Sequence, residues 1–553
     1  MTDPQGVAEM LAARADDDRP AYRQDDQAWT WRQVVADSAQ RAALLRELRR
    51  PGPFHVGIYL ENVPDYLLWL GGTALAGAAT VGINLSRSPA EIESDIRHTD
   101  CQLLVTDRAG RERLAALDLA VGPDRVLAID DPTDDERLAG HAGAGLPAEL
   151  PDPSTLALLL FTSGSTGAPK AVRCTSGRLA TVGAMGVARY GMTPDDVYYC
   201  AMPLFHGNAL MYAWMPVVQV GASVALRPRF SASGFLPDVR RYGATIFNYV
   251  GKSLSYVLNT PEQPDDADNP LVQGYGTEAS WKDVASFERR FGCTLKEGYG
   301  MSEGGGVAIR RTPDTPDGAL GEALSDTILV VDPVSLQECP PARFGSGGAL
   351  ANGDEAIGEI VNTAGLDRFE GYYANPEATA ERTRNGWFWT GDLGYRDEAG
   401  WFYFAGRGRD KLRVDGENFS AAPVERILYR AGDVVGAAVY AVPDPDGSDA
   451  VMVALELRPG ARFDAGAFAA FLADQPDLGP KWVPTFVRVV EALPVTGTNK
   501  VDKGPLRRAG VGGDDPLWWR PDRRVLAYHP LTAADRARYQ QNLEARGRAS
   551  ALT

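Results

Sequence analysis

Residues 158–170 read Leu-Leu-Leu-Phe-Thr-Ser-Gly-Ser-Thr-Gly-Ala-Pro-Lys, an apolar run followed by a loop rich in glycine and hydroxyl groups. Glycine lets backbone N–H groups approach an anion closely, the hydroxyls add hydrogen-bond donors, and Lys170 adds positive charge. We interpret this segment as a loop that binds a polyphosphate. Its expected contacts are Thr162, Ser163, Gly164, Ser165, Thr166, Gly167 and Lys170. The alternative is an ordinary surface loop. Motifs elsewhere in the chain must decide between the two interpretations.

The spacing of this loop differs from the GxxxxGK[ST] pattern of P-loop NTPases. Pro169 stands directly before the lysine, and no serine or threonine follows the lysine to hold Mg²⁺. The sequence therefore disfavours P-loop NTPase chemistry.

The chain has 553 residues, of which 44% are hydrophobic. That length predicts roughly three or four folding units. Its 56 basic and 73 acidic residues give a formal charge of −17. The excess of negative charge argues against nonspecific binding to nucleic acid or to an anionic membrane, so an anionic substrate needs a local basic pocket.

Five cysteines are scattered without CxxC spacing. This pattern favours reduced, packed thiols over a disulfide framework or a zinc site. The N-terminal segment is charged throughout, and we find neither a secretory signal nor an apolar run of about eighteen residues. We therefore expect a cytoplasmic protein without stable insertion into a membrane.

Short apolar runs alternate with longer mixed segments over the first part of the chain. One block has runs at 56–60, 80–84, 103–106 and 126–129, and a second has runs at 197–201, 223–226, 244–250 and 271–273. This βα rhythm predicts two mostly parallel sheets with helices between the strands. From about residue 345 short strands and turns indicate a small β-rich unit, and an α+β region follows it. The predicted fold class is multidomain α/β.

Five further stretches carry residue types that suit nucleotide or acyl chemistry, at 205–206, 298–304, 389–393, 406–410 with 416–418, and 496–500. With loop 162–170, their order and spacing resemble the adenylate-forming superfamily, which contains acyl-CoA synthetases, adenylation domains and beetle luciferases. The resemblance covers nearly the whole chain. Within that superfamily, the chain resembles the fatty-acid-transport or very-long-chain acyl-CoA ligase branch at residues 230–235, 249–256 and 515–519.

The resemblance implies an enzyme that joins a carboxylic acid to ATP as an acyl-adenylate, releases pyrophosphate, and passes the acyl group to the thiol of CoA. A carboxylate is a poor electrophile, and its approach to ATP brings two anions together, so cations and aligned donors must offset the repulsion. The implied co-substrates are ATP and CoA, with Mg²⁺ as the metal. The remaining implied partner is a small-molecule acid, either a fatty acid or a bulky hydrophobic one. Whether the protein forms a homodimer is left open by the sequence.

By resemblance, loop 162–170 holds the β- and γ-phosphates, and Glu303 helps to hold Mg²⁺. Ser302 stands where the family usually has threonine and donates to the α-phosphate. Tyr299 offers an aromatic face to adenine, although by itself it reads as a core aromatic. A backbone wall around adenine is implied for Gly274, Tyr275 and Gly276.

The resemblance also implies that Asp392 and Arg407 bind the ribose, the first as an acceptor with two oxygens and the second as a donor fork. By itself, a Thr-Gly-Asp turn would favour a surface role for Asp392. Lys500 is implied to bridge the substrate carboxylate and the α-phosphate during adenylation. His206 is implied to border the acyl pocket and the path of the thiol.

We expect the acid-binding residues on strand ends beside these motifs, at Tyr249, Val250, Met301, Gly304 and Gly305. Three consecutive glycines at 304–306 leave space for a bulky or polycyclic acid. A flexible loop is the alternative interpretation of these glycines.

Two domains are implied: a large one over 1–406 that binds ATP and the acid, and a small mobile one over 407–553. The small domain carries Lys500 and the CoA-path residues Gly416 and Glu417, and in the family it rotates between the two half-reactions. Arg409 replaces the usual Asp or Lys at the pivot. Pro423 replaces a usual Glu, while Glu425 remains.

Three other functions remain open from the sequence. Arg409 could bias the pivot so that the enzyme only thiolates an acyl-AMP supplied by another enzyme. A carrier protein could accept the acyl group, although no fused Gly-Gly-x-Ser segment is present. A nucleotide-binding regulator without turnover is the third, and the complete set of Lys500, Glu303 and Asp392 argues against it.

Overall fold

The computed structural model describes residues 6–162, 170–345, 350–407, 411–414, 417–445, 449–496 and 500–545, with the backbone alone for Arg407, Lys411, Arg413, Glu417, Asn418 and Ser420. Outside these residues lie the predicted phosphate contacts Ser163, Gly164, Ser165, Thr166 and Gly167, the pivot Arg409 and the CoA-path residue Gly416.

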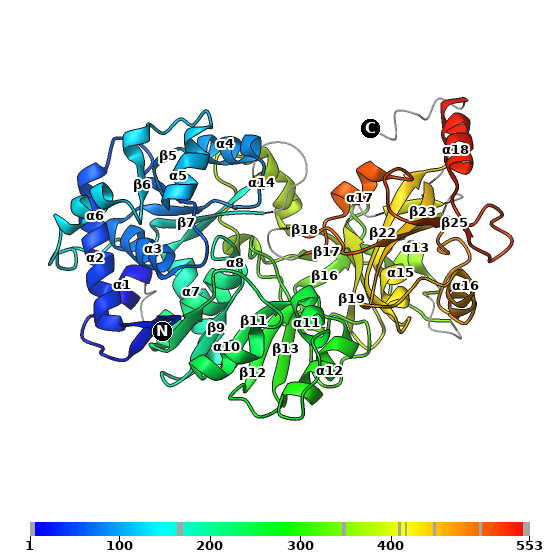
Figure 1. The fold of residues 1–553 in the computed structure, drawn as a ribbon, viewed down its shortest axis with the longest axis horizontal. Coiled ribbons are helices and arrows are strands. Elements are labelled where there is room, and N and C mark those ends of the chain that lie inside the picture. The colour runs from blue at the N-terminus through cyan, green and yellow to red at the C-terminus, as the bar shows by residue number, and fades with distance from the viewer. Residues whose placement is uncertain are drawn as a thin grey trace. The chain divides into compact units, whose positions relative to one another are not determined.

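The chain divides into two compact units, whose elements are labelled in Figure 1. Unit 1 comprises Met1–Glu297, Met301–Gly304 and Asp367–Glu381. Unit 2 comprises Gly298–Gly300, Gly305–Leu366 and Arg382–Thr553. The expected domain boundary at residue 406 stays a prediction.

The first sheet of unit 1 has six strands. Their order is β6 (Val126–Ala128), β5 (Cys101–Thr106), β3 (His55–Ile58), β4 (Ala79–Gly82), β7 (Leu156–Phe161) and β8 (Ala171–Thr175). Neighbouring strands are parallel, except that β7 and β8 pair antiparallel. The four runs predicted in the first block are confirmed as strands with small shifts at their ends, and β8 is a strand that the sequence analysis did not predict.

The second sheet uses the second block of the sequence. Within unit 1 its order is β13 (Thr294–Tyr299), β12 (Gln273–Thr277), β11 (Ile246–Val250), β9 (Val197–Cys200), β10 (Ser223–Leu226), β1 (Pro20–Gln24) and β2 (Gln27–Thr30). These neighbours are parallel apart from β1 and β2. The last residues of β13, Gly298 and Tyr299, belong to unit 2, where they pair with β14 (Ile309–Arg310), which in turn pairs with β15 (Glu322–Ala323).

The strand predicted at 271–273 begins too early, because β12 covers Gln273–Thr277. Its glycines permit close packing: a Cβ at Gly274 would lie 2.5 Å from the Phe247 ring, and one at Gly276 would lie 2.3 Å from the Tyr249 ring. Glycine in a strand often marks such a close approach.

Helices connect the parallel strands, as the βα rhythm predicted. Between β3 and β4 lies α3 (Pro64–Ala76), which begins with a proline in its first turn and ends at Gly77 with φ 71°. The other helices of unit 1 are α1 (Val7–Ala12), α2 (Trp31–Leu48), α4 (Pro89–His98), α5 (Arg108–Ala115), α6 (Pro132–Ala139), α7 (Ser176–Tyr190), α8 (Gly207–Ala209), the π-helical turn η2 (Leu210–Trp214), α9 (Met215–Val220), α10 (Phe235–Tyr242), α11 (Gly251–Leu258), α12 (Trp281–Phe291) and most of α14 (Pro376–Arg382).

One face of the second sheet packs into an apolar core with α10 and α12. Phe247 and Tyr249 of β11 lie there against Phe235, Phe287 and their neighbours. Each of these rings is at most 2% exposed. The strand therefore presents its odd-numbered side chains to this core and its even-numbered ones to the opposite face.

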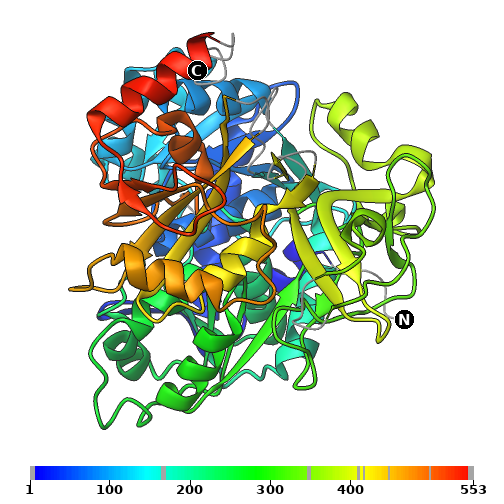
Figure 2. The same cartoon turned by 90° about the vertical axis from the view of Figure 1, so that its right-hand side faces the viewer.

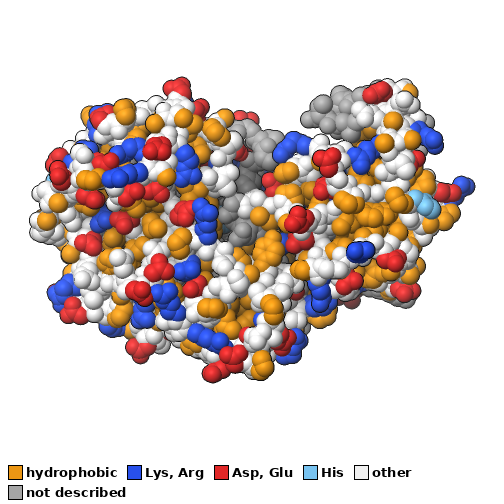
Figure 3. Space-filling model, in the orientation of Figure 1, with side chains coloured by type: hydrophobic (Ala, Val, Ile, Leu, Met, Phe, Trp, Pro, Cys, Tyr) orange, Lys and Arg blue, Asp and Glu red, His pale blue; other side chains and the backbone are white. Residues whose placement is uncertain are grey.

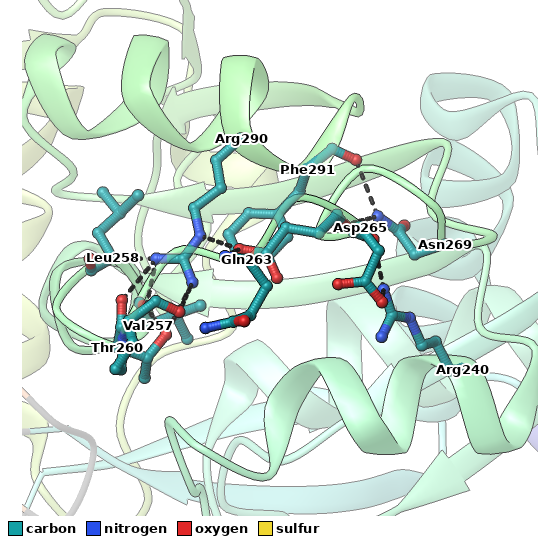
Figure 4. A network of polar contacts seen from close by, with 11 residues as sticks. Arg240, Val257, Leu258, Thr260, Gln263, Asp265, Asn269, Arg290 and Phe291 are labelled. Carbon is teal, nitrogen blue, oxygen red and sulfur yellow. Dashed lines mark hydrogen bonds and ion pairs between the residues drawn. The ribbon is translucent and has the colours of Figure 1, made fainter.

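Arg290 fixes the segment between α11 and β12 (Figure 4). Its guanidinium donates to Asp266 Oδ2 over 2.6 Å and to Thr260 through the hydroxyl over 3.0 Å and the carbonyl over 2.9 Å. Arg290 is 7% exposed and Asp266 is 3% exposed. A buried arginine satisfied in this way holds the end of α11 in place.

Unit 2 contains three sheets besides the β14–β15 pairing. The first is β16 (Ile328–Val331), β17 (Gly358–Asn362), β18 (Phe388–Arg396) and β19 (Phe402–Arg407), all antiparallel; it begins before residue 345, where the β-rich unit was predicted to start. A hairpin of β20 (Lys411–Val414) and β21 (Glu417–Ser420) follows it. The third sheet is β22 (Val434–Pro443), β23 (Asp449–Leu457), β24 (Phe486–Val490), β25 (Leu517–Trp519) and β26 (His529–Pro530).

Helices cover both faces of the third sheet, whose strands run from yellow to orange in Figure 2. On one face are α15 (Ala421–Leu428) and α16 (Ala465–Ala473), and on the other are α17 (Lys503–Ala509) and α18 (Ala533–Ala545). The short helix α13 (Gly353–Ala356) lies earlier in unit 2. The mixed α/β class is confirmed.

On the face of unit 1 visible in Figure 3, basic and acidic side chains are interspersed. The five cysteines are unpaired thiols, four of them buried. Among the helices that the structure describes, none combines the length and the apolar character needed to cross a bilayer.

Candidate active site

The predicted phosphate loop connects two antiparallel strands of the first sheet. Phe161 pairs with Ala171, and the Thr162 N–H donates to the Lys170 carbonyl over 3.1 Å. These bonds close the base of the loop, so Thr162 and Lys170 face each other at its two ends. The loop therefore belongs to a strand–loop–strand hairpin, whereas the loop of P-loop NTPases leads into a helix.

Tyr372 connects two of the predicted site residues within unit 1. Its hydroxyl donates to Glu303 Oε1 over 2.8 Å, and the Lys170 ammonium lies 5.9 Å from the centre of its ring. Tyr372 is 4% exposed and Glu303 is 6% exposed. A cation at that distance from an aromatic face is attracted to it. One tyrosine thus holds a carboxylate and orients a lysine beside the loop.

The backbone of Tyr372 is fixed to strand β8. Tyr372 bridges to Val172, and hydrogen bonds join Arg173 N to Gly371 O over 3.1 Å and Tyr373 N to Ala171 O over 2.8 Å. The side chain therefore has a defined position relative to Lys170.

Ser302 and Gly304 lie beside Arg178 of helix α7. Arg178 Nη2 donates to the Ser302 carbonyl over 2.7 Å, and Nη1 donates to the Arg173 carbonyl over 2.8 Å. A Cβ at Gly304, where φ is 83°, would lie 2.8 Å from Arg178 Nη2. Arg178 therefore fixes the backbone that presents Ser302 and Glu303, and Met301 precedes them as a half-buried residue.

His206 caps the short helix α8, and its Nδ1 accepts from Asn208 N over 3.3 Å. A Cβ at the next residue, Gly207, would lie 3.3 Å from Ser302 Oγ. The structure therefore brings the His206–Gly207 turn and the Ser302 hydroxyl together.

The predicted acid-binding residues of β11 point in opposite directions. Tyr249 is 1% exposed, packs in the aromatic core with α10 and α12, and donates its hydroxyl to Glu297 Oε1 over 3.3 Å. Val250, 4% exposed, belongs to the alternate face and precedes α11. On β12, Tyr275 lies under Arg189, whose guanidinium carbon is 4.7 Å from the ring centre.

In unit 2, Tyr299 and Asp392 are joined directly. The Tyr299 hydroxyl donates to Asp392 Oδ2 over 2.7 Å, and Asp392 is 6% exposed. Asp392 of β18 is also the cross-strand partner of Arg407 in β19. The three predicted nucleoside residues thus belong to one local arrangement.

Gly305 lies in unit 2 with φ 51°, and a Cβ there would lie 2.1 Å from the Phe388 ring. Its carbonyl accepts from Asn362 Nδ2 over 3.0 Å. Gly304 and Gly306 also have positive φ, at 83° and 63°. Backbone conformation and close packing therefore both require glycine at 305.

Lys500 lies just before α17. The Thr496 N–H donates to the Lys500 carbonyl over 2.7 Å, and Val495 bridges to Val501. At the start of α17, Lys503 pairs with Glu425 Oε1 over 2.9 Å, and the same oxygen accepts from Val439 N over 2.7 Å. Lys500 is half-buried. The CoA-path residue Glu417 begins β21.

The structure groups the predicted residues by unit. Thr162, Lys170, His206, Ser302 and Glu303 lie in unit 1, and Tyr299, Asp392, Arg407 and Lys500 lie in unit 2. Tyr372 and Arg178 were missed by the sequence analysis. The contact of Tyr372 with Glu303 spans 69 residues, so no local pattern could have indicated it.

Comparisons with known proteins identify the family of this chain. The profile of the AMP-binding enzyme family matches residues 10–373, and that of the AMP-binding enzyme C-terminal domain matches residues 423–500. A steroid-22-oyl-CoA synthetase of Rhodococcus jostii is 55% identical over 98% of this chain and 98% of its own. The medium/long-chain-fatty-acid–CoA ligase FadD17 of Mycobacterium tuberculosis is 46% identical over 93% of this chain and 98% of its own.

Solved structures show the same fold. The anthranilate CoA ligase AuaEII in complex with anthranoyl-AMP gives a TM-score of 0.80 at 20% identity, over 92% of this chain and 98% of its own. ATP-bound MatB from Rhodopseudomonas palustris gives a TM-score of 0.77 at 25% identity, over 91% of this chain and 99% of its own.

The chain therefore belongs to the AMP-binding enzyme family, within the adenylate-forming superfamily that its motifs resemble. It is an acyl-CoA synthetase, an ATP-dependent ligase that forms a thioester between a carboxylic acid and CoA.

Proposed function

We propose that the acid is bulky and hydrophobic, with a steroid side-chain acid as the first candidate and a long-chain fatty acid as the second. The relative at 55% identity is named for a steroid-22-oyl group and those at 46% for medium and long fatty acids. Identity at this level over nearly the full length of both chains supports a shared class of acid.

The observation that carries the chemistry is the Glu303–Tyr372–Lys170 assembly at the base of loop 162–170. Lys170 with the loop binds the β- and γ-phosphates, and Ser302 donates to the α-phosphate. Fixed cations and donors at these positions offset the repulsion between the carboxylate and ATP. Lys500 supplies the charge between the carboxylate and the α-phosphate.

Glu303 suits the role of a Mg²⁺ ligand. Its Oε1 is held by Tyr372, and among the described residues no hydrogen bond holds its Oε2. In the described part of the chain, no three His, Cys, Asp or Glu side chains form a metal site by themselves. Mg²⁺ in such enzymes is commonly held by one or two carboxylates with substrate phosphates and water, and it neutralises triphosphate charge.

Asp392, Tyr299 and Arg407 bind the nucleoside in this proposal, with Gly274, Tyr275 and Gly276 as the backbone wall. His206 borders the path of the thiol, and the segment with Gly416 and Glu417 lines the pantetheine path. The small domain begins at residue 407.

We also propose a cytoplasmic location, and a homodimer that light scattering would detect.

Incubation with ATP, Mg²⁺, CoA and a panel of acids tests the function. The panel contains a steroid 22-oic acid, octanoic, lauric and oleic acids, and benzoic acid. AMP and a steroid or long-chain acyl-CoA are the expected products. Turnover of benzoic acid alone would refute the proposed class of acid, and release of AMP without any thioester would refute CoA as the acceptor.

A further inference from the structure

Three polar side chains lie on one face of neighbouring strands in the second sheet. Tyr198 of β9 pairs with Ile246 of β11, and Asn248, two residues further along β11, pairs with Tyr275 of β12. Residues two apart on a strand share a face. This face is opposite the apolar core that contains Tyr249.

Helix α7 and the turn η2 add aromatic side chains over the same face. The Tyr190 ring lies 6.2 Å from that of Tyr198 and 5.6 Å from that of Tyr275. The Tyr212 ring lies 5.2 Å from Tyr275. We name Tyr190, Tyr198, Tyr212, Tyr275 and Asn248 the polar layer.

Among the described residues, the enclosed Tyr190 and Tyr198 hydroxyls have only each other within reach, and Asn248 Oδ1 has no hydrogen-bond partner. The three residues are 4%, 0% and 5% exposed. A buried polar atom without a partner costs about 1–3 kcal/mol, and most such atoms in proteins are satisfied. The layer therefore has hydrogen-bonding capacity that the described residues do not use.

The polar layer adjoins the candidate active site. Asn248 Nδ2 donates to Asn208 Oδ1 over 2.6 Å, and Asn208 follows the His206–Gly207 turn. The Ser302 hydroxyl lies against Gly207. The layer is therefore one hydrogen bond away from the turn predicted to border the acyl pocket.

Other unpartnered atoms lack this connection. Ser38 Oγ, Tyr66 Oη and Trp69 Nε1 form a second group. They belong to the packing of helices α2 and α3, which carry none of the predicted site residues. The location of the polar layer, more than the number of its unpartnered atoms, points to the substrate.

We propose that the polar layer recognises a neutral oxygen, a hydroxyl or a ketone, on the hydrophobic body of the acid. The inference rests on the proposed function, since it concerns the acid of that reaction. Asn248 Oδ1 accepts from a hydroxyl, and the tyrosine hydroxyls donate to either oxygen. Burial raises the pKa of both Tyr190 and Tyr198, so the phenols keep their protons. An unsubstituted fatty chain leaves Asn248 Oδ1 unpaired and leaves the two hydroxyls with only each other.

Matched acids test the proposal. The probes are a steroid 22-oic acid with a 3-hydroxyl, a 3-ketone or neither, and lauric acid with and without an ω-hydroxyl. The wild type should favour an oxygenated acid over its deoxy analogue by roughly ten- to a hundredfold in kcat/KM, because the analogue leaves buried groups unpaired. Asn248→Leu should reduce the preference for the hydroxyl acid more than that for the ketone.

Adjacent residues of β9 provide a matched pair of variants. Tyr198→Phe should remove most of the preference, alone or combined with Tyr190→Phe, while leaving kcat/KM for the deoxy acid within about threefold of wild type. Tyr199→Phe makes the same change on the opposite face, where the hydroxyl donates to Asp238 Oδ2 over 3.2 Å, and should keep the preference.

Thermal unfolding without substrate separates recognition from structure. Tyr198→Phe removes a hydroxyl whose one partner among the described residues is Tyr190, so its Tm should stay close to that of wild type. Tyr199→Phe loses its bond to Asp238 and should unfold at a lower Tm. A lower Tm for Tyr198→Phe with an unchanged preference would overturn the inference. If the wild type turned over oxygenated and deoxy acids equally, this inference alone would fail, whereas no AMP from any acid would instead refute the proposed function.

Discussion

The Tyr299 hydroxyl donates to Asp392 Oδ2 over 2.7 Å, so the aromatic ring predicted for adenine and the carboxylate predicted for ribose hold each other in place. Tyr299 belongs to the glycine-rich motif at 298–304, whereas Asp392 belongs to β18, and 93 residues separate them. A change in either residue should therefore alter recognition of the other half of the nucleoside.

Asp392→Asn weakens an acceptor of the ribose hydroxyls. We expect KM for ATP to rise by roughly tenfold or more, because a charged acceptor of a hydrogen bond is replaced by a neutral one. The preference for ATP over 2′-deoxyATP should shrink, and steady-state kinetics with both nucleotides measures it. Tyr299→Phe keeps the ring, so a smaller effect is expected. An unchanged preference in Asp392→Asn would contradict the ribose role.

Tyr372→Phe keeps the ring under Lys170 but removes the hydrogen bond to Glu303. The carboxylate then loses its orientation, so the Mg²⁺ concentration for half-maximal rate should rise about tenfold, with a parallel loss of affinity for MgATP in calorimetry. Tyr373→Phe is the matched control, since its hydroxyl donates to the exposed Asp100 over 2.7 Å. A similar shift in both variants would rule out a specific role for Tyr372.

Lys500→Ala removes the charge expected between the carboxylate and the α-phosphate. The rate of adenylation, measured as release of pyrophosphate, should fall by a factor of roughly 10²–10³. Thioester formation from synthetic acyl-AMP and CoA should be spared, because that step does not bring a carboxylate to ATP. Equal losses in the two half-reactions would exclude a role confined to adenylation.

Burial raises the pKa of Asp95 to about 7, although Arg87 acts in the opposite direction. Between about pH 4 and 7 the folded chain keeps this proton while the unfolded chain has lost it, so the free energy of unfolding falls as pH rises. Asp95→Asn removes that dependence. Its stability relative to wild type should therefore increase from pH 4 to pH 7, by at most about 4 kcal/mol, in urea unfolding. Asp118→Asn, at an exposed carboxylate that pairs with Arg97 over 3.3 Å, is the matched control.

Arg290→Met leaves the buried Asp266 without its charged partner. The free energy of unfolding should fall by roughly 3–5 kcal/mol. Arg240→Met is the control, because that arginine is half exposed and donates to the Asp268 carbonyl over 3.0 Å. The double variant Arg290→Met with Asp266→Leu should recover part of the loss. An additive loss would mean that the ion pair is not the source.

Much of the fold was predictable, because apolar runs between glycine and proline mark most strands of both parallel sheets. The position of β12 was not, since Gly274 and Gly276 have no apolar side chain to indicate a strand. Strand alternation could have separated Tyr249 from Val250, which the sequence analysis grouped together. The family was predictable from ordered motifs that lie locally in the sequence.

The contacts that hold the site were less predictable. Tyr372 and Arg178 act through residues far along the chain, and only tertiary packing brings them together. The unpartnered atoms of the polar layer depend likewise on which strands become neighbours. Such relations leave no pattern in a single sequence.

Strand β8 is the edge of its six-stranded sheet, and its outer side pairs with residues 371–373. An uncovered edge strand is a template for pairing with another chain, which leads to aggregation. The segment that presents Tyr372 to Glu303 therefore also protects the sheet against self-association. The same few residues cover the sheet edge and hold Glu303, so a change that loosens this segment should reduce solubility together with activity.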